Sequence, residues 1–213
     1  MKVLDLYCGV GGASHGIFIA GFDVVGCDIN FQPNYEFEFI QANALEVSLE
    51  GYDAFHASPP CQNYSYATRQ WRNLGNEYPD LIAQTRERLL ATGKPFVLEN
   101  VVGAPLRKDL MLCMSMFDDD RKFMVRRHRI FEIHGFNVPQ PNHPKHIGRV
   151  GDGRIISVFG HGGGKRYNHA TSDLGAWKIA MGLYWAEKRR EVTEAIPPDY
   201  TRYIFRCLKK ELE

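Results

Sequence analysis

The first 28 residues contain a strand, a glycine-rich loop, a helix and a second strand that ends at an acid. The apolar run from Lys2 to Leu6 predicts a short buried strand, and glycines at positions 9, 11 and 12 follow it directly. A helical pattern then continues to Gly21, where it stops. The run from Asp23 to Cys27 predicts a second strand, with Asp28 at its carboxyl end. This order constrains the chain to an α/β fold built on a parallel sheet.

The rest of the chain continues the alternation of strands and helices. Strands are predicted at Phe37 to Gln41, Tyr52 to Ala57, Pro95 to Glu99 and Phe123 to His134, and helices at Asp80 to Thr92, Ala176 to Trp185 and Tyr200 to Leu212. The first of these helices is expected to bury one stripe, formed by Leu81, Ile82, Thr85, Leu89 and Leu90. Residues 137–173 are rich in Gly, Pro, His and Asn and predict an irregular insertion.

Length and composition narrow the class of protein. The 213 residues fit one domain, and no segment approaches the roughly 20 uncharged residues of a membrane span. The five cysteines are scattered without CxxC spacing, which indicates neither a disulfide framework nor a zinc site. We therefore expect a cytoplasmic monomer with reduced thiols that binds neither membrane nor metal.

The formal charge of +1 conceals an uneven distribution. Between Arg121 and Arg166 there are ten Lys or Arg against two acids, a net +8, so the remainder of the chain carries −7. A basic block on an acidic chain indicates binding to a polyanion such as nucleic acid. The alternative is a solvated charged surface without a partner.

One cysteine follows a predicted strand on a turn stiffened by proline. Pro59, Pro60, Cys61 and Gln62 come directly after the apolar run that ends at Ala57. Because reacting groups in open α/β sheets collect beyond the carboxyl ends of the strands, this position suits a nucleophile. The alternative is that the thiol is a small buried apolar group, the common state of a free cysteine.

The glycine loop predicts a site for a cofactor that contains a nucleoside. Glycines after a strand let the backbone approach a ligand, and Asp28, about 20 residues further on, is placed to accept hydrogen bonds from ribose hydroxyls. NAD and S-adenosylmethionine both suit this pattern. Ser14 stands where the dinucleotide fingerprint has its third glycine, which disfavours NAD. Alternatively, Asp28 only caps a turn or helix.

Taken together, five motifs resemble those of the cytosine carbon-5 DNA methyltransferase family, in order and approximate spacing. They are Asp5-Leu6-Tyr7-Cys8-Gly9-Val10-Gly11-Gly12, then Asp28, then Pro60-Cys61-Gln62 with Ser65, then Glu99-Asn100-Val101, and finally Arg127 with Arg129. The resemblance covers nearly the whole chain and is greatest to the short, phage-type members. It implies the S-adenosylmethionine-dependent methyltransferase fold, doubly wound and mostly parallel. Residues 1–136 and 174–213 would form the catalytic domain, and 137–173 a reduced target-recognition insertion.

The resemblance also implies the roles of individual residues. Cys61 would add to carbon 6 of a cytosine flipped out of duplex DNA, Glu99 would act as an acid at ring nitrogen 3, and Arg127 and Arg129 would hold the base carbonyl and the loop. The S-adenosylmethionine site would comprise Tyr7, Gly9, Gly11, Gly12, Asp28, Ile29, Asn43, Ala44 and Pro60. The DNA contacts would be Gln62, Ser65, Asn100, Arg69, Arg72, Lys165 and Arg166. The stretch from Tyr64 to Tyr78 would close behind the base, or would be a plain surface loop anchored by Trp71.

Several positions depart from the family pattern. Asn43 replaces an aspartate in the cofactor site, Val125 replaces a glutamine before the paired arginines, and Phe205 stands where glycine is common. The short insertion leads us to expect short or relaxed sequence specificity. Two other functions stay open at this point: an RNA methyltransferase like the tRNA-acting branch of the family, and a catalytically silent nucleic-acid-binding module.

Overall fold

A seven-stranded sheet forms the centre of the protein. The computed structural model describes residues 1–117, 120–150, 153–159 and 173–213. The sheet contains β1 (Lys2–Leu6), β2 (Asp23–Asp28), β3 (Glu38–Gln41), β4 (Ala54–Ala57), β5 (Phe96–Asn100), β6 (Leu110–Leu112) and β8 (Arg129–His134), in the order β3-β2-β1-β4-β5-β8-β6. A small second sheet pairs β7 (Met124–Val125) in parallel with β9 (Ile155–Ile156).

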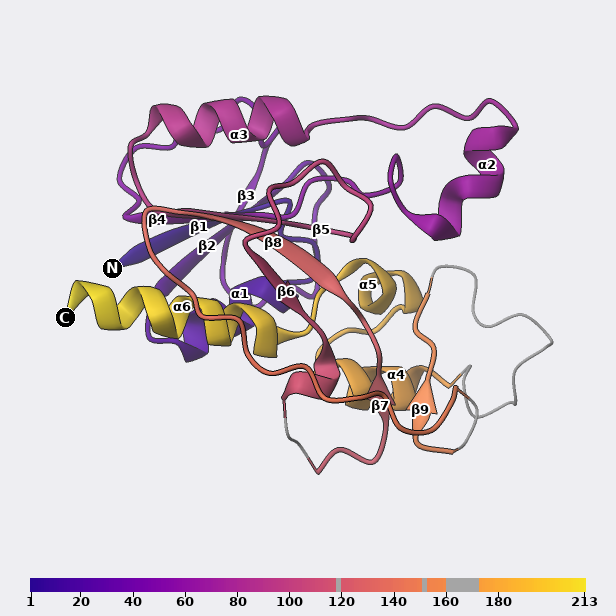
Figure 1. The fold of residues 1–213 in the computed structure, drawn as a ribbon. Coiled ribbons are helices and arrows are strands. Elements are labelled where there is room, and N and C mark those ends of the chain that lie inside the picture. The colour runs from indigo at the N-terminus through magenta and orange to yellow at the C-terminus, as the bar shows by residue number, and fades with distance from the viewer. Residues whose placement is uncertain (118–119, 151–152, 160–172) are drawn as a thin grey trace.

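Helices cover both faces of the large sheet. They are α1 (Gly12–Ile19), α2 (Arg69–Asn73), α3 (Ile82–Ala91), α4 (Leu174–Met181), α5 (Arg189–Glu194) and α6 (Pro198–Leu212), with short 3₁₀ turns at Tyr66–Thr68 and Met114–Met116. In Figure 1, α3 lies on one side of the sheet, α1 and α6 lie on the other, and α2 projects beyond the edge. Each face has its own apolar core. No helix in the described ranges is long and apolar enough to cross a membrane.

The parallel pairing of β1 to β5 brings the carboxyl ends of these strands to one edge of the sheet. These five strands pair in parallel, whereas β8 runs antiparallel between β5 and β6. The chain winds outward from β1 in both directions, with β2 on one side and β4 on the other. Ligands of open α/β sheets bind beyond the carboxyl ends of the strands at such a switch point. The predicted parallel sheet is therefore confirmed, with one antiparallel strand.

Two glycines let α1 pack closely against the last helix. A Cβ on Gly12 would lie 2.2 Å from the carbonyl oxygen of Ile196, and a Cβ on Gly16 would lie 2.1 Å from that of Pro198. A methyl group fits at neither place without backbone movement. Thr201 adds a buried hydrogen bond from its hydroxyl to the carbonyl oxygen of Ala13 at 2.8 Å. These contacts place the amino terminus of α1 under the segment that leads into α6.

Three sequence predictions differ from the structure. The stretch predicted as one strand from Phe123 to His134 forms β7 and β8, which belong to different sheets. The helix predicted to run to Trp185 ends at Met181, because Gly182 takes a left-handed conformation. Leu90 is 51% exposed, because it lies about 100° around the helix from Leu89 and so leaves the buried stripe.

Candidate active site

The turn that carries Cys61 is fixed by backbone hydrogen bonds. Asn100, the last residue of β5, donates its side-chain amide to the carbonyl oxygen of Pro59 at 2.9 Å, inside the protein. The carbonyl oxygen of Cys61 accepts from the backbone N–H groups of Tyr64 and Ser65, at 2.9 and 2.8 Å. Cys61 itself is half-buried and free of any disulfide. The cysteine therefore lies where the sequence predicted, on a rigid turn at the carboxyl end of β4.

Glu99 and Arg129 form a buried ion pair on the neighbouring strands. Glu99 is in β5, with only 4% of its surface exposed, and Arg129 begins β8. The Arg129 Nε lies 2.9 Å from the Glu99 Oε1. No donor among the described residues is aligned on that oxygen for a hydrogen bond. Glu99 is thus charge-compensated but keeps hydrogen-bonding capacity for a ligand.

The charges of this pair act on Cys61. Burial raises the pKa of the Cys61 thiol, the Arg129 guanidinium lowers it, and the Glu99 carboxylate raises it again, with the net pKa above the ordinary value. These interactions bring Cys61, Glu99 and Arg129 into one neighbourhood, as the sequence predicted. The Cys61 thiol therefore holds its proton more firmly than an ordinary cysteine does.

Arg127 is used differently from the interpretation as a base-holding residue. Its guanidinium is buried and donates to three backbone carbonyl oxygens, from Val158 at 3.2 Å, Thr193 at 2.5 Å and Ala195 at 2.9 Å. Burial, with the nearby Arg129, lowers its pKa to about 9. In this structure Arg127 ties β7, β9 and the chain before α6 together, and Arg129 alone contacts the acid.

The glycine loop and Asp28, which the sequence predicts to bind the cofactor, lie against each other and are called the glycine corner below. The Asp28 carboxylate accepts from the backbone N–H of Gly9 at 3.1 Å and from that of Asn30 at 2.9 Å. Gly9 has φ +50°, and a Cβ there would meet nothing within 4 Å, so its surface is open. Gly11 caps α1 in the left-handed region, at φ 88°. Gly12 is committed to the close contact with Ile196 described above.

Four other residues predicted for the cofactor site have contacts of their own. Tyr7 has φ +60° and a hydroxyl 2.8 Å from that of Thr85, and Ile29 is 66% exposed beside Asp28. The Asn43 side-chain oxygen accepts from the Leu45 N–H at 3.0 Å, and the Ala44 carbonyl accepts from Arg88. The Asn43 oxygen has two lone pairs, so one acceptor position is left for a ligand.

The loop after Cys61 is held by an arginine predicted to contact DNA. Arg72 is half-buried and donates through one nitrogen to the carbonyl oxygens of Gln62 and Ser65, at 2.7 and 2.8 Å. The Ser65 hydroxyl caps the following 3₁₀ turn by accepting from Ala67. Arg69 is exposed, and the Gln62 side-chain oxygen is buried without a hydrogen-bond partner among the described residues. In this structure Arg72 stabilises the loop, whereas Arg69 is available to a phosphate.

A hollow of about 530 Å³ lies between this loop and the turn after Asn100. Its lining comprises Tyr64, Ser65, Tyr66, Arg69, Arg72, Val101, Val102 and Gly103. The lining combines aromatic rings with two cations, and it is formed by the segments that follow Cys61 and Glu99 in the sequence. Lys165 and Arg166, also predicted to contact DNA, lie outside the described residues.

Several arginines of the basic segment between Arg121 and Arg166 make contacts inside the protein. Arg121 forms an ion pair with Asp199 at 2.5 Å, and Arg126 donates to the carbonyl oxygens of Ile147 and Gly148, at 2.8 and 2.7 Å. The ion pairs of Arg121 with Asp199 and of Arg129 with Glu99 offset part of the +8 counted from the sequence, whereas Arg126 keeps its charge but is held by the backbone. The exposed part includes Lys122 and Lys145.

Sequence reasoning missed a buried polar network behind the glycine loop. Asp5 accepts from the Ser14 hydroxyl at 2.5 Å and lies 2.7 Å from the His56 Nδ1, and all three side chains are fully buried. Asp5 and His56 are directly paired in the register of β1 and β4. The network joins the two strands and α1 at the base of the site. The sequence does show Asp5 and His56 inside otherwise apolar strands, and this pattern could have indicated a buried polar pair.

Comparison with known proteins finds similarity to DNA methyltransferases. A family model of C-5 cytosine-specific DNA methylases matches residues 1–141. The chain is 30% identical over 135 residues to the type II methyltransferase M.HgiDI of Herpetosiphon aurantiacus, covering 56% of this chain and 43% of that protein. It is 32% identical over 123 residues to M.HgiGI of the same organism, covering 51% of this chain and 96% of that one. The chain thus spans less than half the length of M.HgiDI.

The fold comparison covers the whole chain. The solved structure of the S. pombe Dnmt2 methyltransferase superposes on this chain with a TM-score of 0.58 and 14% identity, covering 100% of this chain and 99% of that one. At this identity the likeness concerns the fold alone. The predicted S-adenosylmethionine-dependent methyltransferase fold is confirmed.

Proposed function

Because the chain belongs to the C-5 cytosine-specific DNA methylase family, we propose that it transfers a methyl group from S-adenosylmethionine to carbon 5 of cytosine in double-stranded DNA. One observation carries the proposal: the half-exposed thiol of Cys61 shares the edge of the sheet with the buried Glu99–Arg129 pair. A protein that only bound nucleic acid would have no evident need for a thiol and a buried acid together. The silent-module alternative is weaker for that reason.

The residues of the glycine corner fit the cofactor. Each Asp28 oxygen accepts one backbone N–H and keeps a lone pair for a ribose hydroxyl. Above Gly9 nothing lies within 4 Å of the Cβ position, which leaves room for the ligand. Ile29 and Phe31, both 66% exposed, offer apolar surface to an adenine ring beside the acid. S-adenosylmethionine bound there supplies an electrophilic methyl group.

The Cys61 sulfur is the nucleophile of the proposed reaction. After losing its proton to solvent, the sulfur bonds to carbon 6 of the cytosine, which makes carbon 5 electron-rich enough to take the methyl group, and S-adenosylhomocysteine is left. Carbon 5 then loses its proton to solvent, the electron pair of that bond re-forms the ring double bond, and the carbon–sulfur bond breaks to restore the thiolate. Every bond formed to the enzyme is broken again, so the protein is unchanged after one cycle.

Glu99 and Cys61 are coupled through charge. The Glu99 carboxylate raises the pKa of the Cys61 thiol, and the Arg129 guanidinium lowers it. If one proton is taken up from solvent as the base binds, and is shared between the Glu99 carboxylate and ring nitrogen 3, the negative charge that Glu99 exerts on the thiol is neutralised. Binding of the base therefore lowers the pKa of Cys61 at the moment when the thiolate is needed.

The loop after Cys61 provides for a base outside the duplex. Extruding a base costs a few kcal/mol, which contacts to the loop and the phosphates must offset. Tyr66 is 84% exposed and Arg69 is exposed, both on the wall of the 530 Å³ hollow. An aromatic ring and a cation at this place suit stacking and a phosphate contact. The short insertion at 137–173 supports short or relaxed sequence specificity.

Methyl transfer to genomic DNA tests the proposal. The protein is incubated with unmethylated DNA and labelled S-adenosylmethionine, with tRNA as competitor, and modified cytosines are mapped. We expect label in DNA, lost in Cys61→Ala and retained in Cys207→Ala, a half-buried cysteine on α6 that serves as the matched control. Undiminished transfer by Cys61→Ala, or label in tRNA alone, would contradict the proposal.

A further inference from the structure

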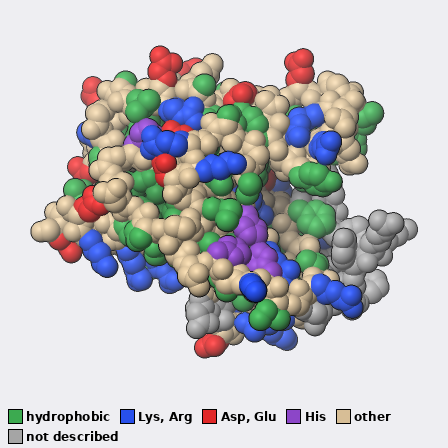
Figure 2. Space-filling view, in the orientation of Figure 1, with side chains coloured by type: hydrophobic (Ala, Val, Ile, Leu, Met, Phe, Trp, Pro, Cys, Tyr) green, Lys and Arg blue, Asp and Glu red, His purple; other side chains and the backbone are tan. Residues whose placement is uncertain are grey.

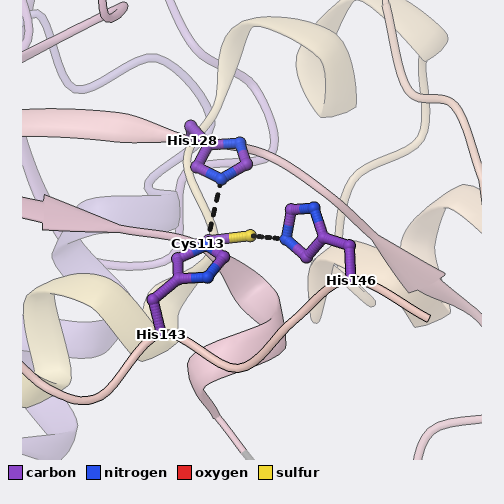
Figure 3. A group of neighbouring side chains, drawn as sticks. All are labelled: Cys113, His128, His143 and His146. Carbon is purple, nitrogen blue, oxygen red and sulfur yellow. Dashed lines mark hydrogen bonds between the residues drawn. The ribbon is translucent and has the colours of Figure 1, made fainter.

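Four side chains with metal-binding atoms converge at a second place in the structure. They are Cys113, directly after β6, His128, directly before β8, and His143 and His146, from the segment after β8. Their donor atoms all lie within 4.8 Å of one another. Figure 3 shows the three imidazoles arranged around the sulfur, and Figure 2 shows a histidine cluster at the surface with Lys and Arg beside it. The proposed methyl transfer uses none of these residues.

Two of the six distances between donor atoms are close to those in a tetrahedral site, and all four atoms lie within 4.8 Å of one another. The Cys113 Sγ lies 3.4 Å from the His146 Nε2, and the His128 Nε2 lies 3.1 Å from the His143 Nε2. Around a zinc ion with bonds of about 2.3 Å to sulfur and about 2.0 Å to nitrogen, neighbouring ligand atoms are roughly 3.3–3.6 Å apart. Both distances are within about 0.3 Å of this range.

The ring nitrogens are set for a cation. The His143 Nδ1 lies 2.8 Å from the carbonyl oxygen of Pro144, so that nitrogen must carry the proton and donate it. The Nε2 of a neutral His143 then carries a lone pair, and it faces the Nε2 of His128. Metal-bound histidines are held in this way by a backbone carbonyl on the other ring nitrogen.

The sulfur is equally well placed. Cys113 is fully buried, and the Ser115 hydroxyl donates to its sulfur at 3.2 Å, an interaction that supports a thiolate. A thiolate with three neutral imidazoles is a zinc-type donor set, whereas Mg²⁺ and Ca²⁺ prefer oxygen.

We propose that Cys113, His128, His143 and His146 bind one zinc ion in a closed, four-ligand structural site. The ion would fasten the start of the 137–173 insertion to the edge of the sheet formed by β6 and β8. Because His128 stands between Arg127 and Arg129, it would also fix the backbone that presents Arg129 to Glu99. The sequence-based expectation of no metal rested on the absence of CxxC spacing, and these ligands come from three separate segments.

Metal content of the purified protein tests this site independently of methyl transfer. The untagged protein, produced with zinc in the medium and dialysed without chelator, is measured by inductively coupled plasma mass spectrometry. We expect one zinc per chain, and an affinity reduced at least about 100-fold in His146→Ala, since loss of even an outer-shell partner costs 10–100-fold. His134→Ala, on β8 outside the cluster, is the matched control and should keep the metal.

Cobalt substitution provides a second readout if one variant folds poorly. The Co²⁺ protein should show the visible bands of a tetrahedral ion and a sulfur-to-cobalt charge-transfer band, and Cys113→Ser should lose only the latter. Circular dichroism separates misfolding from loss of a ligand. Zinc well below one equivalent together with no tetrahedral cobalt spectrum, or full zinc retention in a His143→Ala/His146→Ala double variant, would overturn the proposal.

Discussion

Replacing Glu99 by glutamine separates the contribution of the buried ion pair to folding stability from its contribution to methyl transfer. The substitution keeps the shape of the side chain but removes the negative charge that faces the guanidinium of Arg129, whose side chain is 14% exposed. Breaking a buried pair costs about 3–5 kcal/mol. Arg129 still donates to the carbonyl oxygen of His128 at 2.9 Å and reaches some solvent, so we expect about 2 kcal/mol here.

The Glu99→Gln variant should lose more of its methyl-transfer rate than its loss of about 2 kcal/mol in folding stability alone would explain. A positioned acid contributes about 10²–10⁴-fold, so single-turnover methyl transfer by Glu99→Gln should slow by that factor. Urea unfolding of the wild type, Glu99→Gln, Arg129→Met and the double variant completes the test. The double variant leaves no unpaired charge, so it should recover about 1–2 kcal/mol relative to additivity while staying slow. A wild-type transfer rate in Glu99→Gln, or no coupling in the cycle, would refute this reasoning.

Three further predictions follow from separate parts of the structure. Because burial raises the pKa of the Cys61 thiol in the free protein, methyl transfer at subsaturating DNA should rise with pH through neutrality, and a flat profile would argue against a thiolate in the slow step. Gly12→Ala should cost about 1–3 kcal/mol in urea unfolding, because its methyl would lie 2.2 Å from the carbonyl oxygen of Ile196; an unchanged midpoint would show that the α1–α6 contact adapts. Burial raises the pKa of Glu132, but hydrogen bonds led by Arg86 outweigh this and lower it to about 2, so its stabilisation is present above about pH 4.5 and is lost as pH falls towards 2. Glu132→Gln should therefore lose about 2 kcal/mol at pH 7 and little at pH 2, and an equal loss at both would contradict the lowered pKa.

The positions of the first five strands along the chain could be predicted because local signals repeat, whereas their order in the sheet came from the structure. Glycines, prolines and apolar runs mark the ends of each element, and β1 with its glycine loop fixes where the sheet starts. β6 was missed because Leu110–Leu112 is too short to show alternation. The division of the predicted strand into β7 and β8 depends on pairing with β9, about 30 residues later, which no local pattern reveals.

In the candidate site, too, local sequence patterns located residues but did not reveal contacts with distant parts of the chain. Cys61, Glu99 and Arg129 lie at the ends or starts of strands, so motif spacing located them. Arg127 was predicted to hold the base, but its carbonyl partners at Thr193 and Ala195 lie more than 60 residues away along the chain. The role of Arg72 depends similarly on how its own loop folds back. Side-chain partners supplied by tertiary structure, rather than residue type, decided these roles.

A trapped covalent complex tests the central claim most directly. Duplex DNA containing 5-fluorocytosine is incubated with the protein and S-adenosylmethionine, the complex is digested, and the modified peptide is identified by mass spectrometry. Fluorine at carbon 5 cannot leave as a proton does, so the carbon–sulfur bond persists. The account predicts one modified peptide, carrying the base on Cys61. Methylation of ordinary DNA without any adduct, or an adduct on another cysteine, would contradict it.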